Sequence, residues 1–495
     1  MFIGGEWVAS SSGETREVIN PYDASVICHV AEDTVEDAEH AIAAAKKAFY
    51  EDGWGDTPAY ERAALLRSFA DEMEANVEKL AKAETLNTGK ALIESEYDVY
   101  DSANILRYYA GIVTQPTGQT YDLNDPAVHA MTVREPLGVC ALIVAWNFPI
   151  SLAIWKLAPA LAAGNAIILK PSEITPLSAI LMTEMMEKVG FPKGVVNLVM
   201  GAGATVGNTL ASSLDVDKVA FTGGIVTGRK IMCAASSNVK GISLELGGKS
   251  PNIIFADADF DTAVDYGLYG MFYNQGEVCS AGSRILVEDT IYDRYLEKLI
   301  EGAKKIKIGN GFEEGVKMGP VISKQHMEKV LKYIEIGKEE GATVALGGYR
   351  MTEPEYEKGY FIAPTIFTDT TPEMRIVQEE IFGPVVVIQK FHGEEEAIQL
   401  ANNTTYGLAA GIFTSDSAKA LRVVKKIRAG ITWINTYGPV YPEAPWGGYK
   451  QSGIGRELGT YGLDDYTEVK QININTNVCP TGWFCLLYTS PSPRD

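Results

Sequence analysis

Long apolar runs alternate with amphipathic runs over most of the chain. The least polar stretch extends from Pro136 to Leu169 and carries Lys156 as its only charge. Its length alone would allow a transmembrane helix, but Asn147-Phe148-Pro149, Pro159 and Gly164-Asn165 divide it into a β-rich run, a helical run and a second β-rich run. Because parallel strands covered on both faces read as continuous apolar runs, this stretch predicts a buried βαβ unit.

The same alternation continues on both sides of this unit. Two runs in the N-terminal third, Thr34 to Phe49 and Ala59 to Leu86, have the apolar period of surface helices. Later runs predict a helix at Pro176 to Val189 and strands at Gly194 to Met200, Val216 to Phe221, Pro251 to Phe255, Arg284 to Val287 and Pro384 to Ile388. Strands that trade places with helices predict an α/β fold with doubly wound sheets.

Composition agrees with a large globular protein and narrows its partners. The chain has 495 residues, of which 46% are hydrophobic and 22% charged, so about two to four domains are expected. Its 43 basic and 64 acidic side chains give a net charge of −21, which repels nucleic-acid phosphates and anionic membranes. We expect neither partner, whereas small cationic substrates are compatible with this charge.

Cysteine and histidine spacing argues against two further classes. The six cysteines contain no CxxC pair and no paired framework, so a reducing cytoplasm is expected. The first residues lack the basic and apolar regions of a secretory signal. The five histidines contain no HxxxH pair, and therefore no metal site is predicted.

Cys279 is a candidate nucleophile. A lone cysteine is most often an inert buried side chain, but Cys279 follows the run from Asn274 to Val278, where a glycine turn can direct the sulfur and a main-chain N–H at one reacting group. No histidine is near in sequence, so another base is required. Glu245 lies between Leu244 and Leu246, where desolvation would raise its pKa and suit it to general-base work; the alternative is an edge-strand surface carboxylate.

Glycine turns after two strands indicate a nucleotide site. The run from Gly201 to Gly207 nearly matches the dinucleotide fingerprint, with the third glycine one residue late. The run from Phe221 to Gly228 also follows a strand and opens a helix, whose free N–H groups can receive pyrophosphate. In Lys170-Pro171-Ser172-Glu173, the acidic side chain can accept from ribose hydroxyls and disfavour an extra phosphate, which favours NAD over NADP.

These motifs, in this order, resemble the aldehyde dehydrogenase superfamily from Ile3 to Phe484. Trp146-Asn147-Phe148-Pro149 and the runs from Glu379 to Pro384 and from Pro445 to Gly453 carry the resemblance further. It implies that Cys279 attacks the aldehyde carbon while the Asn147 amide and the Cys279 N–H hold the oxyanion. Hydride then passes to NAD, and Glu245 activates the water that hydrolyses the thioester.

The resemblance implies further roles. Lys156 and Glu457 resemble a proton-relay pair behind the general base. Glu380 would hold the nicotinamide ribose, and the full set of implied cofactor contacts is Trp146, Lys170, Ser172, Glu173, Gly203, Gly207, Phe221, Gly223, Gly224, Gly228, Leu246, Glu380 and Phe382. Glu277 departs from the family, which often has glutamine there, and a carboxylate so close to Cys279 is expected to raise the thiol pKa.

Within the superfamily, the likeness is greatest to bacterial betaine aldehyde dehydrogenases, through GGEW, GVCALIVAWNFP, WKLAPALAAGN, EVCSAGSR and TGWF. Phe148, Trp155, Tyr273 and Trp446 fall at positions that resemble that family's aromatic cage. Each aromatic face attracts a quaternary ammonium by roughly 0.5 to 2 kcal/mol. The resemblance therefore implies oxidation of betaine aldehyde to glycine betaine.

Two alternatives stay open. Phe148, Tyr273 and Val440 differ from the pattern of plant members, which is compatible with an apolar funnel for aliphatic, aromatic or amino aldehydes; Glu443 near the mouth would instead favour a cation. A catalytically silent scaffold is the alternative of a different class. The joint presence of Cys279, Glu245 and Asn147 argues against it.

The resemblance also suggests a division of the chain. Residues 1–116 and 137–247 are predicted to form a Rossmann-type NAD-binding domain, and residues 248–463 an α/β catalytic domain. The ranges 117–136 and 464–484 read as strands outside both cores; such strands pair between subunits in the family, so a homodimer or homotetramer is expected. Residues 485–495, CLLYTSPSPRD, look like a translated sequencing adapter, so the authentic chain is expected to end near Phe484.

Overall fold

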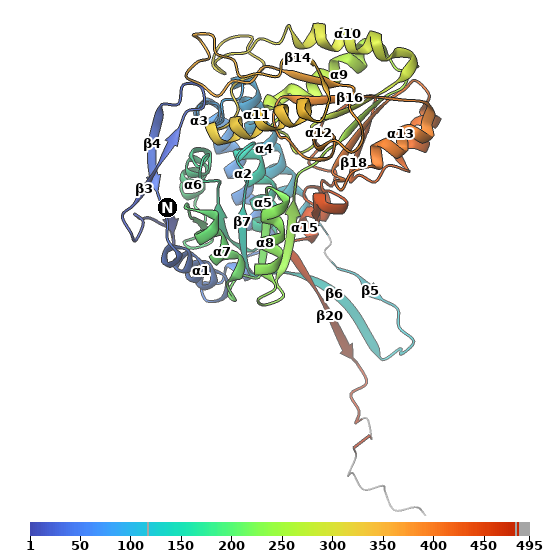
Figure 1. Cartoon of the computed structure of the whole chain (residues 1–495). Coiled ribbons are helices and arrows are strands. Elements are labelled where there is room, and N and C mark those ends of the chain that lie inside the picture. Colours follow the sequence, from blue (N-terminus) through green and yellow to red (C-terminus); the bar gives the residue numbers. More distant parts are fainter. Residues whose placement is uncertain (116–117, 481–482, 485–495) are drawn as a thin grey trace, which may run out of the picture.

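The computed structural model describes residues 1–115, 118–480 and 483–484. The predicted adapter, 485–495, the first half of TGWF, 481–482, and the start of the first predicted oligomerisation strand at 117 lie outside the described residues. Two sheets with helices packed on them form the body, and a third, smaller sheet projects from it (Figure 1). The α/β prediction is confirmed.

The helices include those predicted at Thr34 to Phe49, at Pro176 to Val189 and inside the βαβ unit, together with others that the apolar periodicity did not single out. Their bounds are α1 Val35–Tyr50, α2 Ala59–Ala75, α3 Val77–Thr88, α4 Leu92–Ile112, α5 Pro149–Ala163, α6 Leu177–Val189, α7 Asn208–Ser212, α8 Ile225–Ala235, α9 Phe260–Phe272, α10 Tyr292–Ala303, α11 Lys324–Glu339, α12 Arg375–Gln378, α13 Gly393–Asn402, α14 Ser417–Val424 and α15 Gly459–Asp464.

One predicted helix is wrong in extent. The run from Ala59 to Leu86 forms two helices, α2 and α3, because the chain leaves helical geometry at Asn76, where φ is −119° and ψ is 24°. The Asn76 amide donates to the Glu72 carbonyl oxygen at 2.8 Å. Asparagine side chains compete with the helix for backbone groups in this way, which is why asparagine favours helix ends.

The first sheet contains the predicted βαβ unit. Strands β7 (Val139–Ile143) and β8 (Ala166–Lys170) are parallel neighbours, joined by α5. Every residue of α5 is buried, including Lys156, as expected for a helix inside a large core. Among the described residues, none of the helices combines the length and the apolarity that a bilayer crossing needs.

The order of strands in this sheet is β19-β11-β10-β7-β8-β9-β1-β2. Strands β7 to β11 are parallel, so their carboxyl ends meet at one edge, where α/β sheets bind ligands. The remaining bounds are β1 Phe2–Ile3, β2 Glu6–Trp7, β9 Val196–Leu198, β10 Lys218–Thr222, β11 Gly241–Glu245 and β19 Gly453–Ile454. Strand β19 falls within the range predicted for the catalytic domain yet pairs with β11; the domain boundaries stay a prediction.

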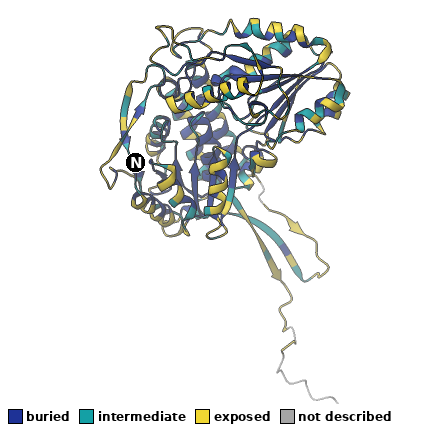
Figure 2. Ribbon diagram, viewed as in Figure 1, coloured by how far each residue is buried: buried dark blue, intermediate teal, exposed yellow. Residues whose placement is uncertain are grey.

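The second sheet has the order β14-β15-β16-β13-β12-β17-β18 and is parallel except at β14. Its bounds are β12 Pro251–Ile254, β13 Arg284–Glu288, β14 Thr343–Leu346, β15 Thr365–Thr368, β16 Val385–Phe391, β17 Ala409–Phe413 and β18 Ile431–Ile434. The central strands are buried in both sheets (Figure 2), which explains their uninterrupted apolar runs.

The projecting sheet consists of β5 (Thr120–Tyr121), β6 (Val128–Pro136) and β20 (Thr467–Asn475). β6 and β20 pair antiparallel along their whole length, from Thr467 opposite Pro136 to Asn475 opposite Val128. Much of this sheet is exposed (Figure 2). A further hairpin, β3 (Thr15–Ile19) and β4 (Val26–Ala31), lies beside the first sheet.

Candidate active site

One cavity brings together most of the residues that the sequence singles out. Predicted catalytic and substrate residues on its wall are Asn147, Phe148, Trp155, Glu245, Tyr273, Cys279, Trp446 and Glu457, and predicted cofactor residues are Trp146, Gly223, Gly224, Leu246, Glu380 and Phe382. Lys156 lies directly behind the wall. The other predicted cofactor residues, Lys170, Ser172, Glu173, Gly203, Gly207, Phe221 and Gly228, do not line this cavity.

The turn before Cys279 contains three consecutive residues with positive φ, and only one of them is glycine. Asn274, Gln275 and Gly276 all adopt left-handed backbone, with φ of 46°, 57° and 72°. Consecutive residues of this kind are strained unless their surroundings hold them. A Cβ at Gly276 would lie 2.5 Å from the Gly383 carbonyl oxygen, so this position needs glycine for conformation and for space.

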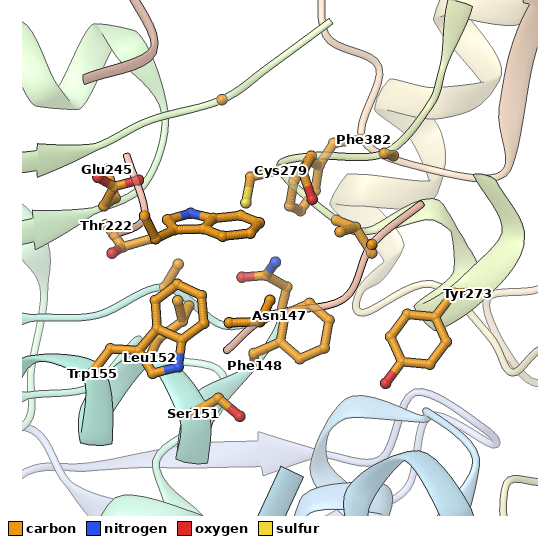
Figure 3. A pocket seen from close by; sticks show the side chains of 18 of the residues that line it. Asn147, Phe148, Ser151, Leu152, Trp155, Thr222, Glu245, Tyr273, Cys279 and Phe382 are labelled. Atoms are coloured by element: carbon orange, nitrogen blue, oxygen red, sulfur yellow. The ribbon is translucent and has the colours of Figure 1, made fainter. Parts of the chain in front are cut away.

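Asn147 is fastened to the same loop. It follows β7, and its Nδ2 donates to the Glu277 carbonyl oxygen at 2.9 Å. The Asn274 amide donates in turn to the carbonyl oxygens of Asn147, at 3.0 Å, and Glu277, at 3.3 Å. The Asn147 side chain consequently points toward Cys279 (Figure 3), where an amide can stabilise negative charge on a reacting oxygen.

The thiol is protonated at rest. Burial first, and then Glu245 and Glu380, raise the pKa of Cys279 to about 12. Glu277, which was expected to raise this pKa, is not among these causes; its carboxylate instead accepts from the Ile322 N–H at 2.9 Å and lies 3.6 Å from His326 Nε2. A neutral thiol needs a proton acceptor when it attacks, because the thiolate is the nucleophile.

Glu245 is enclosed at the end of β11, opposite Thr222 in the register of β10. It is 6% exposed, so the alternative of a surface carboxylate is wrong; β19 covers what would have been the sheet edge. Burial and then Glu457 raise the pKa of Glu245 well above its usual range, against the attraction of Lys156. A Cβ at Gly447 would lie 3.0 Å from Glu245 Oε1. The absence of a side chain at Gly447 therefore allows the backbone there to approach the Glu245 carboxyl group.

Lys156 and Glu457 form a buried ion pair behind Glu245. The Lys156 ammonium donates to Glu457 Oε1 and, at 2.6 Å, to Thr222 Oγ1. Glu457 is held by paired backbone bonds to Trp446, of 2.7 and 2.8 Å. Thr222 was not anticipated as a site residue, although its place at the end of a strand beside Glu245 is a usable signal.

Four aromatic rings line the part of the cavity that α5 and α9 border. The Phe148 and Tyr273 rings, seen in Figure 3, stack with their centroids 6.3 Å apart and their planes 19° apart. The ring centroids of Trp155 and Trp446 are 5.4 Å apart, with an interplanar angle of 66°. The Lys90 ammonium lies 4.1 Å from the centroid of the Phe148 ring. The predicted cage residues therefore share one cavity, with Phe148 already facing one cation of the protein.

Two acidic residues in the aromatic part of the cavity were not predicted from the sequence. Asp98 and Asp101 line the cavity from α4, and burial, followed by Asp98, raises the pKa of Asp101 to about 6. The Asp98 carboxylate accepts from Lys90 at 2.7 Å. Their spacing of three residues, which places side chains on one helical face, was the available signal. Glu443, expected near the mouth, is exposed and is not on the cavity wall.

The glycine turns after β10 and β9 follow parallel strands of the first sheet at its carboxyl edge, where a dinucleotide would bind. A Cβ at Gly224, which precedes α8, would meet nothing within 4 Å, whereas one at Gly223 would lie 2.4 Å from the Phe221 ring. Near the other turn, the Gly203 N–H donates to Glu173, whose Oε1 lies 3.7 Å from Lys170 Nζ. An open helix N-terminus with a carboxylate at hand fits a pyrophosphate and a ribose.

Glu380 lies on the wall of the same cavity as Gly223 and Gly224. Its Oε1 accepts from the Gly248 N–H at 3.0 Å, and burial raises the pKa of Glu380 to about 7. His326 and Lys329, three residues apart on α11, also line the cavity and were not predicted. Burial lowers the pKa of His326 to about 4, so it is neutral in the physiological range.

The fold and this arrangement define the class: the chain belongs to the aldehyde dehydrogenase family, whose model matches residues 7–472. It is 51% identical to betaine aldehyde dehydrogenase of Bacillus subtilis over 98% of this chain and 99% of that one, and 47% identical to an aldehyde dehydrogenase of Emericella nidulans over 96% and 94%. A crystal structure of betaine aldehyde dehydrogenase from Staphylococcus aureus in complex with NAD+ is 50% identical, with a TM-score of 0.97 over 98% of this chain and 96% of that one.

Proposed function

We propose that this protein oxidises betaine aldehyde to glycine betaine, with NAD as the hydride acceptor. The observation that carries the proposal is the meeting of Cys279, Asn147 and Glu245 in one cavity beside four aromatic rings. The aldehyde dehydrogenase family, to which the chain belongs, accounts for the oxidation itself. The aromatic and acidic wall accounts for the preference for a cationic aldehyde.

The first half-reaction forms a thioester. Cys279 Sγ passes its proton to Glu245 and bonds to the aldehyde carbon, while the carbonyl oxygen takes negative charge beside the Asn147 amide and the Cys279 N–H. This proton leaves Glu245 for solvent before hydrolysis, and the thiolate that hydrolysis later releases takes a proton back. NAD, when bound, accepts the hydride that leaves this carbon, and collapse of the oxyanion gives the thioester. Glu380 and the turns at Gly224 and Gly203 would hold the cofactor.

The second half-reaction is hydrolysis. Glu245 takes a proton from water as the water oxygen bonds to the thioester carbon, and the C–S bond breaks to release the acid and the Cys279 thiolate. The raised pKa of Glu245 suits it to accept that proton near neutral pH. The proton must then leave Glu245 before the next turnover.

Glu173 supports NAD as the cofactor in preference to NADP. Its carboxylate lies beside the Gly203 N–H and Lys170, where it can accept from ribose hydroxyls but would repel a 2′-phosphate. The Staphylococcus aureus relative was crystallised with NAD+. Replacing Glu173 with glutamine is therefore expected to reduce the ratio of kcat/KM with NAD to kcat/KM with NADP.

A cation is favoured by two independent features of the substrate wall. The rings of Phe148, Trp155, Tyr273 and Trp446 offer faces that attract a quaternary ammonium. Asp98 and Asp101 add negative charge, of which Lys90 offsets part. Because Lys90 already lies on Phe148, the two tryptophans and Tyr273 are expected to carry most of the discrimination.

The test compares betaine aldehyde with 3,3-dimethylbutanal, which has the same shape without the charge. We expect kcat/KM with NAD to favour the cation by about tenfold or more. Trp446→Ala should remove most of this preference and Trp446→Phe, which retains a face, should keep part of it. Equal values for both aldehydes would support the second candidate, a general or amino-aldehyde dehydrogenase, for which the apolar character of the same rings is the favouring observation.

Catalytic silence is tested by the thiol itself. A working site should give one iodoacetamide adduct at Cys279 whose rate changes when NAD is present, together with NADH formation from at least one aldehyde. Absence of NADH formation with every aldehyde tried, and labelling of Cys279 no different from that of exposed Cys233, would identify a scaffold instead.

We also propose that the protein acts in the cytoplasm as a homodimer or homotetramer. The support is the projecting sheet of β5, β6 and β20, which carries exposed apolar side chains, Val469 at 55% and Ile474 at 46%. Exposed strands of this kind are templates for pairing with another chain. A second copy of this chain is the partner that family resemblance favours.

A further inference from the structure

Three buried oxygen atoms behind the active site have no hydrogen-bond partner among the described residues. They are Glu457 Oε2, Tyr109 Oη and Tyr466 Oη. Tyr109 comes from α4, and Tyr466 and Glu457 from the segments on either side of α15. Buried polar atoms in folded proteins are almost always satisfied by protein or by ordered water, so three together indicate a common ligand.

The three groups lie around α15. A Cβ at Gly462, in the middle of this helix, would lie 2.4 Å from Tyr109 Oη and 3.6 Å from Glu457 Cα. Gly462 therefore gives the Tyr109 hydroxyl its place beside the Glu457 segment. Burial, followed by the Glu457 charge, raises the pKa of both tyrosines well above the usual range, which fits two hydroxyls that stay protonated near one carboxylate.

The inner end of this cluster reaches the reacting groups. Glu457 uses its Oε1 to accept from Lys156, which leaves Oε2 for another partner. Glu457 also lines the cavity and is the strongest charge acting on Glu245. Glu245 and Glu457 therefore share one cavity wall and lie within electrostatic reach of each other.

The outer end reaches the surface at Asp465, the residue before Tyr466. Its Oδ2 accepts from Ser243 and lies 3.1 Å from Lys218 Nζ, and its side chain is 26% exposed. Asp465 lines an open hollow with Arg456 and Tyr461. Its charge also raises the pKa of both tyrosine hydroxyls, so Asp465 lies within electrostatic reach of the cluster.

We propose that Tyr109 and Tyr466 hold water against Glu457 Oε2 and that this hydrated cluster carries protons from Glu245 to the surface beside Asp465. The inference rests on the proposed function and extends it, since it assigns positioning roles to two residues outside the cavity wall. In each hydrolysis the attacking water gives one proton to Glu245. That proton moves to Glu457, an O–H bond breaking on one carboxyl as another forms, and then through the held water to solvent.

The test follows Tyr109→Phe, Tyr466→Phe and the double variant with p-nitrophenyl acetate and without cofactor. A burst of p-nitrophenolate reports acylation of Cys279, and the steady phase reports hydrolysis of the thioester. We expect the burst to change less than twofold. The steady rate of the double variant should fall at least fivefold, its pH profile should move, and its solvent deuterium isotope effect should increase.

Tyr295→Phe is the matched control, because Tyr295 is also buried and its hydroxyl donates to the Ala263 carbonyl oxygen at 3.0 Å, away from the site. It should leave both phases unchanged. An equal fall of burst and steady phase in the tyrosine variants, or no change in either phase, overturns the inference. Failure of the proposed function looks different, because wild type would then give no burst that Cys279→Ser abolishes.

A crystal structure of the wild-type protein gives a readout independent of activity. The inference requires ordered water within hydrogen-bond distance of Glu457 Oε2 and at least one of the two tyrosine hydroxyls. A dry cluster, in which these atoms contact only apolar groups, overturns it whatever the rates are.

Discussion

At the scale of single residues, burial acts in the same direction on the thiol and on the carboxyl group of the site. It raises the pKa of both Cys279 and Glu245, and the Glu245 charge raises the pKa of the thiol further. Lys156, which could have ionised Glu245, is already paired with Glu457. A resting site of this kind protects the thiol from oxidants, because the thiolate is the reactive form.

Glu245→Gln should separate the two half-reactions. The amide cannot take a proton from water, so we expect a burst of NADH close to one per site followed by turnover reduced about 10²- to 10⁴-fold. Rapid mixing with an aldehyde and NAD measures both phases. Glu443→Gln, exposed and outside the cavity wall, is the control and should match wild type; full turnover in Glu245→Gln would assign the base elsewhere.

The sequence motifs could predict those site residues whose own side chain is proposed to take part in the reaction. Cys279, Glu245 and Asn147 stand in segments whose composition already suggests their use, and the structure brings them into one cavity. Asp98, Asp101 and His326 lie on α4 and α11, two helices that are not among the predicted elements. Only the packing of α4 and α11 against the cavity distinguishes them from solvated residues.

At the scale of elements, the segment before Cys279 depends on its neighbours for its shape. Three consecutive left-handed residues are costly for the isolated loop, and the Phe382–Gly383 segment packs against them. Sequence could predict a turn from Gly276. It could not predict that Asn274 and Gln275 share the conformation, because non-glycine residues enter it only when tertiary contacts hold them.

Gly276→Ala should therefore reduce activity strongly, unlike the same substitution at a left-handed glycine in an exposed turn. A Cβ there meets the Gly383 carbonyl oxygen at 2.5 Å, so we expect at least a hundredfold loss of kcat/KM and a lower Tm. Gly341→Ala is the matched control: its φ of 94° is equally left-handed, but nothing lies within 4 Å. It should cost about 1 kcal/mol of stability and no activity. Similar losses of kcat/KM and Tm in both variants would show that the positive φ alone, and not the contact with Gly383, causes the effect.

The pairing of α3 with α4 buries a group of charges that titrates near neutrality. Glu84 is fully buried, with Lys90 Nζ 3.8 Å from its Oε1. Burial raises the pKa of Glu84 to about 7, which Lys90 only partly opposes. Between its usual value and 7 the folded state holds a proton that the unfolded state has lost, so this group makes stability fall as pH rises through that range.

Glu84→Gln should remove that fall. Relative to wild type, its Tm should rise as pH increases from 5 to 7.5, with a change in unfolding free energy of at most about 3 kcal/mol. Thermal unfolding at several pH values measures the slope. Glu78→Gln, exposed on the same helix, should run parallel to wild type from pH 6 to 7.5; a Glu84→Gln curve parallel to wild type would mean that Lys90 keeps Glu84 ionised.

Secondary structure could be predicted for helices that bury one face and for strands that are buried on both faces. The βαβ unit and the strands β9, β10, β12, β13 and β16 followed from apolar runs, since nothing else explains such runs in a chain with so many charged residues. The break at Asn76 and the short strand β19 did not. One depends on a single side-chain hydrogen bond, and the other on a partner strand about two hundred residues earlier.

At the scale of the whole molecule, the projecting sheet is the part that the body does not cover. The sequence could predict strands outside both cores but not the number of subunits, because β5, β6 and β20 offer edges and apolar side chains without specifying what covers them. The same limit applies to the substrate: the resemblance names a class of aldehyde, and the acidic residues that support it became visible only in the folded chain.

Ile474→Lys should weaken the assembly and leave the subunit folded. Burying an isoleucine side chain contributes about 1.5–3 kcal/mol per copy, and a lysine there would carry its charge into the interface. Light scattering after size exclusion should show a lower mass at micromolar concentration, with circular dichroism unchanged. Val239→Lys, at a residue that is 92% exposed and outside this sheet, is the control; unchanged mass for Ile474→Lys would assign the interface to another surface.

Strand β19 also imposes an order on synthesis. β11 carries Glu245 and is made before residue 246, but the strand that covers its edge, Gly453–Ile454, is the last to join this sheet, and Glu457 follows it. Chains fold from the N-terminus as they emerge, so the nascent first sheet must wait through some two hundred residues with an open apolar edge. Until then Glu245 lacks this cover and Glu457 is absent, so we expect a chain that stops before residue 453 to be unable to hydrolyse a thioester.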